Sequence, residues 1–117
     1  MFEVNNPNLT SWVEVLAESD FPIQNLPFGI FSAADRSVRP GVAIGEHILD
    51  LTEVAALGLL DGLGCERSDF DAATLNAFIG RGKQSTRDVR NRLGELLQTG
   101  ATELADHVDR VLVRQSD

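Results

Sequence analysis

The sequence is short of the residue types on which most catalytic sites depend. Its 117 residues include one cysteine, two histidines, one lysine and no tyrosine. A single cysteine, Cys65, excludes an intrachain disulfide and with it a secreted disulfide-rich scaffold. Enzyme pockets combine several titratable groups from distant segments, so this small stock argues against a complete enzyme.

Long apolar runs and positive charge are also scarce. No stretch approaches the roughly 20 apolar residues that a membrane-spanning helix needs, and the first residues lack the basic and apolar regions of a signal peptide. Ten Lys and Arg face 18 Asp and Glu, which gives a net charge of −8. Phosphates repel such a surface, so neither nucleic acid nor a membrane is expected as a partner. Since no signal peptide is visible, the cytoplasm is the expected compartment.

What is present is the composition of one globular domain, with 43% hydrophobic and 24% charged residues. The charge is unevenly spread. Residues 1–71 hold twelve acids and three bases, whereas residues 81–92 hold five bases and one acid. We expect the basic run to be the outer face of a helix. The alternative is a patch that contacts an acidic surface of a partner or of the chain's own first half.

β-Strand patterns occupy the first half of the chain. Residues 28–32 follow a proline that favours an extended chain, and residues 12–15 alternate weakly between apolar and polar. Residues 41–51 match a β-hairpin in which Gly45 and Glu46 form a type II′ turn. The opposed pairs expected in this hairpin are Ile44 with His47 and Val42 with Leu49.

Helical patterns occupy the second half. Residues 84–99 place Val89, Leu93, Leu96 and Leu97 on one helical face. Three further helices are expected: residues 53–60 capped by Thr52 and ended by Gly62 or Gly64, residues 72–79 capped by Asp71, and residues 103–112 started by Thr102. The last of these would form an antiparallel helical hairpin with residues 84–99, and residues 113–117 are an alternative strand. Strands mainly within 11–51 followed by helices mainly within 52–112 predict one α+β domain over residues 1–117.

The two histidines do not form a recognisable catalytic or metal-binding pattern. His47 and Asp50 are three apart in a strand, which places them on opposite faces and prevents an acid–base pair. His107 follows Glu103 by four residues on a helix, the spacing of a solvated surface pair. No His-Glu-x-x-His motif or Cys/His cluster accompanies either histidine.

We expect the remaining reactive groups to have structural roles. Cys65 has only Arg67 nearby as a cation, so a structural thiol is favoured over a nucleophile. The segment Gly80-Arg81-Gly82-Lys83 fails the phosphate-loop pattern and is expected to be a turn between helices. The acidic pairs Glu18/Asp20 and Asp69/Asp71 lack a fixed separation, and the second pair is better placed for capping helices. We therefore expect no catalytic, cofactor-binding or metal-ligating residue in this chain.

One segment is unusual in composition. Residues 21–31 contain three phenylalanines and two prolines, which predicts an extended chain that packs against the sheet. Completing the core is one interpretation, and docking against another domain is the other.

Three blocks of sequence resemble the fumarylacetoacetase family. The first is residues 19–32, Ser-Asp-Phe-Pro-Ile-Gln-Asn-Leu-Pro-Phe-Gly-Ile-Phe-Ser, preceded by Ser11-Trp12. The second is residues 41–51, Gly-Val-Ala-Ile-Gly-Glu-His-Ile-Leu-Asp-Leu, and the third is residues 74–80, Thr-Leu-Asn-Ala-Phe-Ile-Gly. They occur in the family's order, whereas residues 84–117 match only in helical character.

The resemblance implies a small SH3-like β-barrel with accompanying helices, the family's N-terminal domain. Members of the family hydrolyse 4-fumarylacetoacetate to fumarate and acetoacetate in tyrosine and phenylalanine catabolism. Their chemistry, with Ca²⁺ or Mg²⁺ held by carboxylates, lies in a C-terminal catalytic domain whose motifs are not matched here. The resemblance thus implies an inactive domain that packs on its own catalytic domain in a homodimer.

Two other functions remain open. A stand-alone SH3-like interaction module would bind peptides in a groove formed by Trp12 and the phenylalanines. An independent enzyme based on Cys65, His47 or His107 is the third hypothesis.

Overall fold

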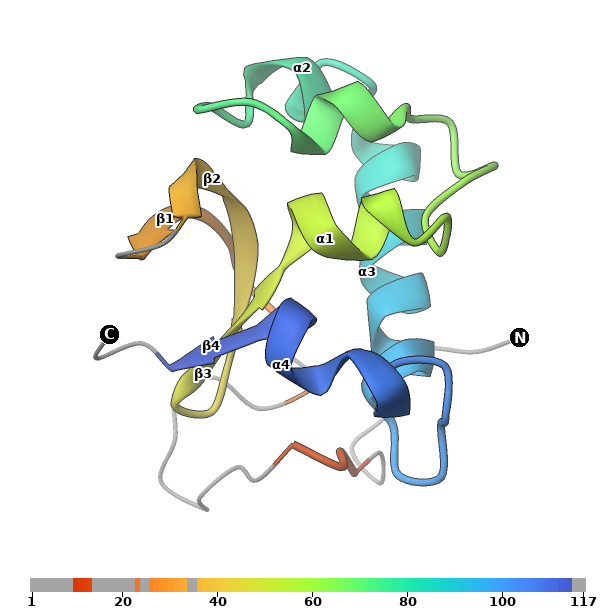
Figure 1. Cartoon of the computed structure of the whole chain (residues 1–117). Coiled ribbons are helices and arrows are strands. Elements are labelled where there is room, and N and C mark those ends of the chain that lie inside the picture. The colour runs from red at the N-terminus through yellow and green to blue at the C-terminus, as the bar shows by residue number, and fades with distance from the viewer. Residues whose placement is uncertain (1–9, 14–22, 24–25, 34–35, 115–117) are drawn as a thin grey trace.

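The computed structural model describes residues 10–13, 23, 26–33 and 36–114. In chain order the elements are β1 (Phe28–Ala33), β2 (Arg36–Ile44), β3 (His47–Asp50), α1 (Leu51–Ala56), the 3-10 helix η1 (Arg67–Phe70), α2 (Asn76–Ile79), α3 (Lys83–Leu97), the 3-10 helix η2 (Ala105–His107), α4 (Val108–Val111) and β4 (Leu112–Arg114). The fold is a small mixed domain in which strands precede most of the helices, as the sequence predicts, and a last strand returns to the sheet (Figure 1).

The four strands form an antiparallel sheet in the order β1-β2-β3-β4. Within the described part of the chain β1 and β4 are the two edges, and they do not pair with each other. The sheet is therefore open, and the SH3-like barrel that the resemblance implies is not confirmed.

The central hairpin has the predicted register. Val42 pairs with Leu49 and Ile44 pairs with His47. Gly45 has a φ of 57°, the left-handed conformation that the first turn position requires and that glycine adopts without strain. Val42, Ile44 and Leu49 are at most 1% exposed, so this face of the hairpin belongs to the core.

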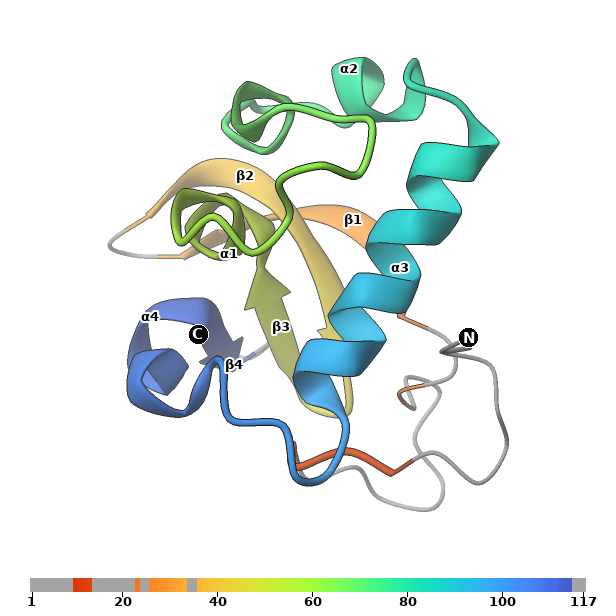
Figure 2. The same ribbon diagram turned by 90° about the vertical axis from the view of Figure 1, so that its right-hand side faces the viewer.

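The longest helix, α3, packs on that face. Its four predicted apolar residues, Val89, Leu93, Leu96 and Leu97, are fully buried. Figure 2 shows that α3 and α1 lie on the same face of the sheet. Phe70 and Phe78 extend the core toward η1 and α2, with ring centroids 4.9 Å apart.

The helix after β3 begins differently from the prediction. Asp50, rather than Thr52, is the N-cap of α1, and its carboxylate accepts a hydrogen bond from the Glu53 backbone N–H at 3.2 Å. Thr52 instead donates from its hydroxyl to the Phe70 carbonyl. The helix ends at Ala56, several residues before the predicted glycines, and the chain then turns at Gly58 with a φ of 81°.

Two other predicted helices are shorter than expected. Residues 71–75 form bends rather than a helix capped by Asp71, and only Asn76–Ile79 is helical. These bends turn the chain so that Phe70 and Phe78 meet in the core, a tertiary contact that overrides the helical preference of residues 72–75.

The predicted helix 103–112 is also wrong. It is divided into η2 and the single turn α4, because Leu112 already enters β4 to pair with Leu49. Since α4 packs against α1 and β3, the expected helical hairpin with α3 is not formed. The alternative strand at residues 113–117 is confirmed for Val113 and Arg114 in β4, and residues 115–117 lie outside the described residues.

Of the strand predicted at residues 12–15, residues 12 and 13 form a bend, and residues 14 and 15 lie outside the described residues. The preceding residue, Ser11, forms an isolated bridge with Gln98. The described part of the phenylalanine-rich segment supports the interpretation that it completes the core. Ile23 and Leu26 are 3% and 0% exposed, and Phe28 packs edge-on against Phe78. Residues 21, 22, 24 and 25 lie outside the described residues.

Candidate functional site

The histidines lie apart from each other and from any metal-like grouping. His47 faces the core side of β3 opposite Ile44, and Asp50 lies on the other face, as predicted. Glu103 does not pair with His107 as expected but lies 3.7 Å from Arg92. Over the residues that the structure describes, no three His, Cys, Asp or Glu side chains are grouped closely enough to hold a metal ion.

The thiol of Cys65 is half-buried, and its surroundings oppose nucleophilic character. Burial raises the pKa of the Cys65 thiol above its usual range, and the negative charge of Asp69 acts in the same direction. A nucleophilic cysteine needs the opposite shift, because only the thiolate reacts. The structure therefore agrees with a structural thiol.

The predictions for the basic segment, residues 80–92, are confirmed only in part. Residues 80–82 form the predicted turn between α2 and α3, and Lys83 is already the first residue of α3. Arg81 contacts an acidic part of the first half of the chain, since its guanidinium donates to both Asp69 carboxylate oxygens at 2.9 and 3.1 Å. Asp69 also accepts from the Glu66 backbone N–H, so it caps η1 as expected. On α3, Arg90 lies over the ring of Phe28 at 4.7 Å rather than facing outward.

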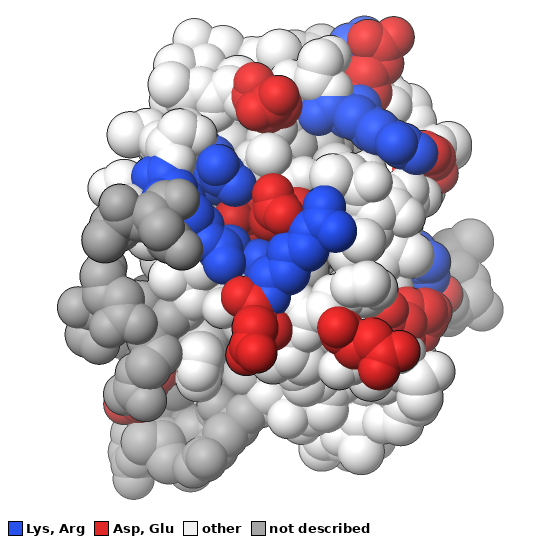
Figure 3. Space-filling view, in the orientation of Figure 1, with Lys and Arg blue, Asp and Glu red and all other residues white. Residues whose placement is uncertain are grey.

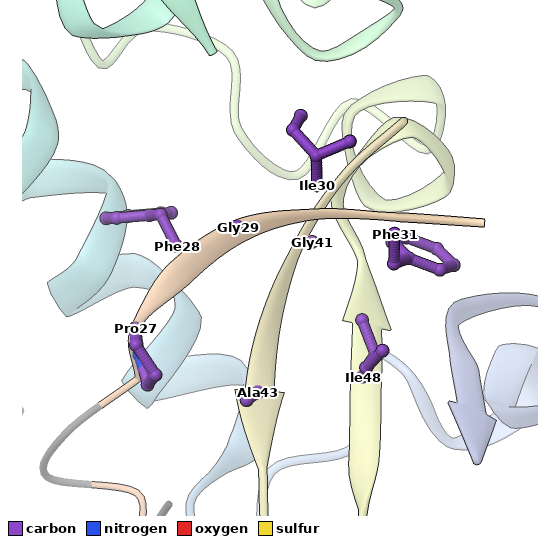
Figure 4. Close-up of a pocket in the computed structure, with 8 residues that line it drawn as sticks. All are labelled: Pro27, Phe28, Gly29, Ile30, Phe31, Gly41, Ala43 and Ile48. Atoms are coloured by element: carbon purple, nitrogen blue, oxygen red, sulfur yellow. The ribbon is translucent and has the colours of Figure 1, made fainter. Parts of the chain in front are cut away.

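Among the described residues, an apolar groove lies on the face of the sheet opposite α3. It has a volume of about 200 Å³. Its lining residues are Pro27, Phe28, Gly29, Ile30, Phe31, Gly41, Ala43 and Ile48, shown in Figure 4. We call this feature the sheet groove. Five consecutive residues come from β1 and its entry, so the groove follows an edge strand.

Strand alternation and one glycine build the sheet groove. Val42 and Leu49 face the core, so their neighbours Gly41, Ala43 and Ile48 face the opposite side. A Cβ atom at Gly41 would lie 2.6 Å from Ile48 and 2.8 Å from the ring of Phe31. The missing side chain therefore lets Phe31 and Ile48 approach each other across β2 and form the floor of the groove (Figure 4).

A cluster of arginines and carboxylates flanks one end of the sheet groove. Asp50, which is 0% exposed and pairs with Gly41 in the sheet, accepts from Arg36 at 2.7 Å and from Arg39 at 3.2 Å. Arg39 and Arg110 also contact Glu53, at 3.4 and 2.5 Å. We call these five side chains the arginine cluster. Figure 3 shows basic side chains gathered around carboxylates on this face of the molecule.

The chemistry of the sheet groove suits a protein contact better than catalysis. All eight lining residues are apolar or glycine, so none can transfer a proton. Pockets for small molecules usually have volumes of about 300–1,000 Å³ and a few convergent polar groups. A volume of about 200 Å³ without polar groups fits one or two apolar side chains.

The sequence patterns did not predict the sheet groove. Trp12, expected in an aromatic groove, instead packs against the core and donates from its indole N–H to the Leu96 carbonyl at 2.9 Å. Phe70 and Phe78 are core residues as well. The available indication was the alternation in residues 41–49, which leaves Gly41, Ala43 and Ile48 on the face away from the core.

The molecule is a small mixed α and β domain with an apolar groove on one face of its sheet. Its described residues contain no group of three potential metal ligands. The family model described as "Fumarylacetoacetase N-terminal" matches residues 24–117. The chain belongs to this family of fumarylacetoacetase N-terminal domains. Across the described residues, no helix is both long enough and apolar enough to cross a membrane.

Relatives from animals and plants agree with this assignment. A fumarylacetoacetase of Caenorhabditis elegans is 44% identical over 93% of this chain and 27% of the relative. Those of Arabidopsis thaliana and Homo sapiens are each 39% identical over 85% of this chain and 24% of the relative. The chain thus spans about a quarter of the length of the curated relatives it matches.

Proposed function

We propose that this chain is the non-catalytic N-terminal domain of a fumarylacetoacetase and that it packs on the catalytic domain of that enzyme. The main support is the match to the N-terminal family model combined with coverage of only 24–27% of the relatives. The complete enzyme would hydrolyse 4-fumarylacetoacetate to fumarate and acetoacetate in tyrosine and phenylalanine catabolism, as a cytoplasmic homodimer. Closure of the sheet into an SH3-like barrel stays a prediction within this proposal.

The described residues do not fit the divalent metal site expected of the complete enzyme. No group of three suitable ligands exists among them, and the sheet groove contains no titratable side chain. Ca²⁺ or Mg²⁺ would therefore be held by the catalytic domain, and we derive no step of the hydrolysis from this chain. Its role in the proposal is structural.

The proposal is tested by assaying fumarylacetoacetate hydrolysis with the purified 117-residue chain in the presence of Ca²⁺ or Mg²⁺. The expected rate equals that of the buffer, because no general base or metal site is assigned here. The Caenorhabditis elegans relative in full length is the positive control. Metal-dependent turnover by the chain alone would contradict a non-catalytic role.

The alternative of a peptide-binding module is separated by a second measurement. Titration with proline-rich peptides is expected to give no saturable binding, because Trp12 is engaged with the core and the chain has no tyrosine. Saturable binding of such a peptide to the chain would favour the module instead.

A further inference from the structure

The sheet groove is an apolar surface at the edge of an open sheet, and the proposed function leaves open which surface of the domain meets the catalytic domain. Phe31, Ala43 and Ile48, which line the groove, are half-buried. Helices α1 and α3 lie on the other face of the sheet, away from the groove (Figures 1 and 2). An apolar groove of this kind has the shape of a pocket that receives the anchoring side chain of a partner.

We propose that the sheet groove is the surface that receives the catalytic domain, through one or two apolar side chains seated between Phe31 and Ile48. This inference rests on the proposed function. In the relatives, the polypeptide outside the matched region is about three quarters of the chain, which supplies a partner of sufficient size. The groove's volume of about 200 Å³ sets the number of side chains that it can hold.

The connectivity of the fold favours this surface. The family match extends to residue 117, so in a relative the remaining polypeptide continues beyond β4. β4 is the edge strand beside β3, and Val113 pairs with Ile48, a floor residue of the groove. A chain that leaves β4 therefore starts beside β3, the strand that supplies Ile48 to the groove.

The charge beside the groove gives the contact a chemical preference. The arginine cluster contains three arginines and two carboxylates, an excess of one positive charge on a chain of net charge −8. Arg110 is the most exposed of the three arginines, at 45%. The complementary surface of the catalytic domain would present an apolar side chain to the groove and an acidic residue to Arg110 beside it.

The test mixes the 117-residue chain with the Caenorhabditis elegans relative from which the matched quarter has been removed and measures the dissociation constant by titration. Ala43→Asp places a charge in the groove, and Val38→Asp is the matched control on the same strand, because Val38 is 47% exposed and does not line the groove. We expect at least tenfold weaker binding for Ala43→Asp and a change below twofold for Val38→Asp. Circular dichroism and thermal unfolding verify that both variants are folded.

The outcomes separate the inference from the proposed function. Binding of the unmodified chain that Ala43→Asp leaves unchanged would overturn the sheet groove as the contact and retain the proposed function. Failure of the unmodified chain to bind a folded partner would overturn both. A dimer of the chain that Ala43→Asp dissociates, seen by sedimentation, would mean that a second copy occupies the groove, which also overturns the inference.

A second measurement applies where the shortened relative does not fold. The matched quarter of the intact relative is replaced by this chain, and hydrogen exchange is compared between the hybrid and the chain alone. We expect added protection in β1 and β2 but not in η1, none of whose residues lines the groove. Protection confined to other elements would overturn the inference, and unchanged exchange throughout the chain would overturn the proposed function.

Discussion

At the scale of single residues, Asp50 connects three parts of the molecule. Its carboxylate caps α1, accepts from two arginines of β2 and is completely buried. One of these arginines, Arg36, also donates to the carbonyls of Asp109 and Arg110 in α4. The burial of this carboxylate is compensated by the two guanidinium groups and the Glu53 backbone N–H that donate to it.

Asp50→Ala is expected to lower the free energy of unfolding by about 3–5 kcal/mol, because it leaves two arginine charges with reduced compensation and removes the helix cap. Urea denaturation monitored by circular dichroism measures the change. Asp61→Ala is the matched control, since Asp61 pairs with Arg67 at an exposed site and should leave stability nearly unchanged. Similar losses in the two variants would refute the role assigned to Asp50.

Cys65 gives a chemical prediction at the same scale. Because burial raises the pKa of its thiol, alkylation by iodoacetamide should be slower at pH 7.5 than that of a cysteine in an unfolded peptide. The rate should continue to rise with pH beyond the titration of the peptide thiol. Following the rate from pH 7 to 10 by mass spectrometry tests this, and a midpoint below that of the peptide would contradict it.

At the scale of elements, α3 and the central hairpin behave as their patterns predict, whereas the 103–112 segment does not. The α3 pattern has four apolar positions on one face, and all four are fully buried against the sheet. In the 103–112 segment the same spacing is present, but pairing of Leu112 with Leu49 ends the helix early. A pattern determines the local preference, and a competing strand partner can override it.

Leu93→Ala tests the packing of α3. We expect a loss of about 2–5 kcal/mol in the free energy of unfolding, the cost of emptying a fully buried leucine site. Arg87→Ala on the exposed side of the same helix is the control. Its change in the free energy of unfolding should be near zero, because alanine favours the helix and no core contact is lost. A small effect of Leu93→Ala would mean that α3 contributes little to the core.

At the scale of the whole molecule, the stability of the domain depends on how its many acids are paired. The hydrogen bonds from Arg81 hold the pKa of Asp69 below its usual value, and the Glu66 backbone N–H acts in the same direction. A carboxyl whose pKa is lower in the folded state stabilises the fold above the unfolded pKa of about 3.9, and this contribution is lost as the pH falls through the folded pKa.

Arg81→Gln should therefore destabilise the domain at pH 7 and differ progressively less from the original chain as the pH falls below about 4. Unfolding free energies measured between pH 7 and pH 2 test this dependence. Arg67→Gln is the control, because its pair with Asp61 is exposed and screened by solvent. A difference between Arg81→Gln and the original chain that is independent of pH would contradict the role of Asp69.

The sequence by itself determined the hairpin register, the buried face of α3 and the position of the first strands ahead of most of the helices. These properties depend on neighbours within about ten positions, where strand and helix periodicity act directly. Only the tertiary structure decided the cap at Asp50, the short α4, the open sheet and the sheet groove. Each of these depends on contacts between residues far apart in the chain, such as Arg36 with the Arg110 carbonyl, 74 positions away. Local periodicity contains no information on such pairs.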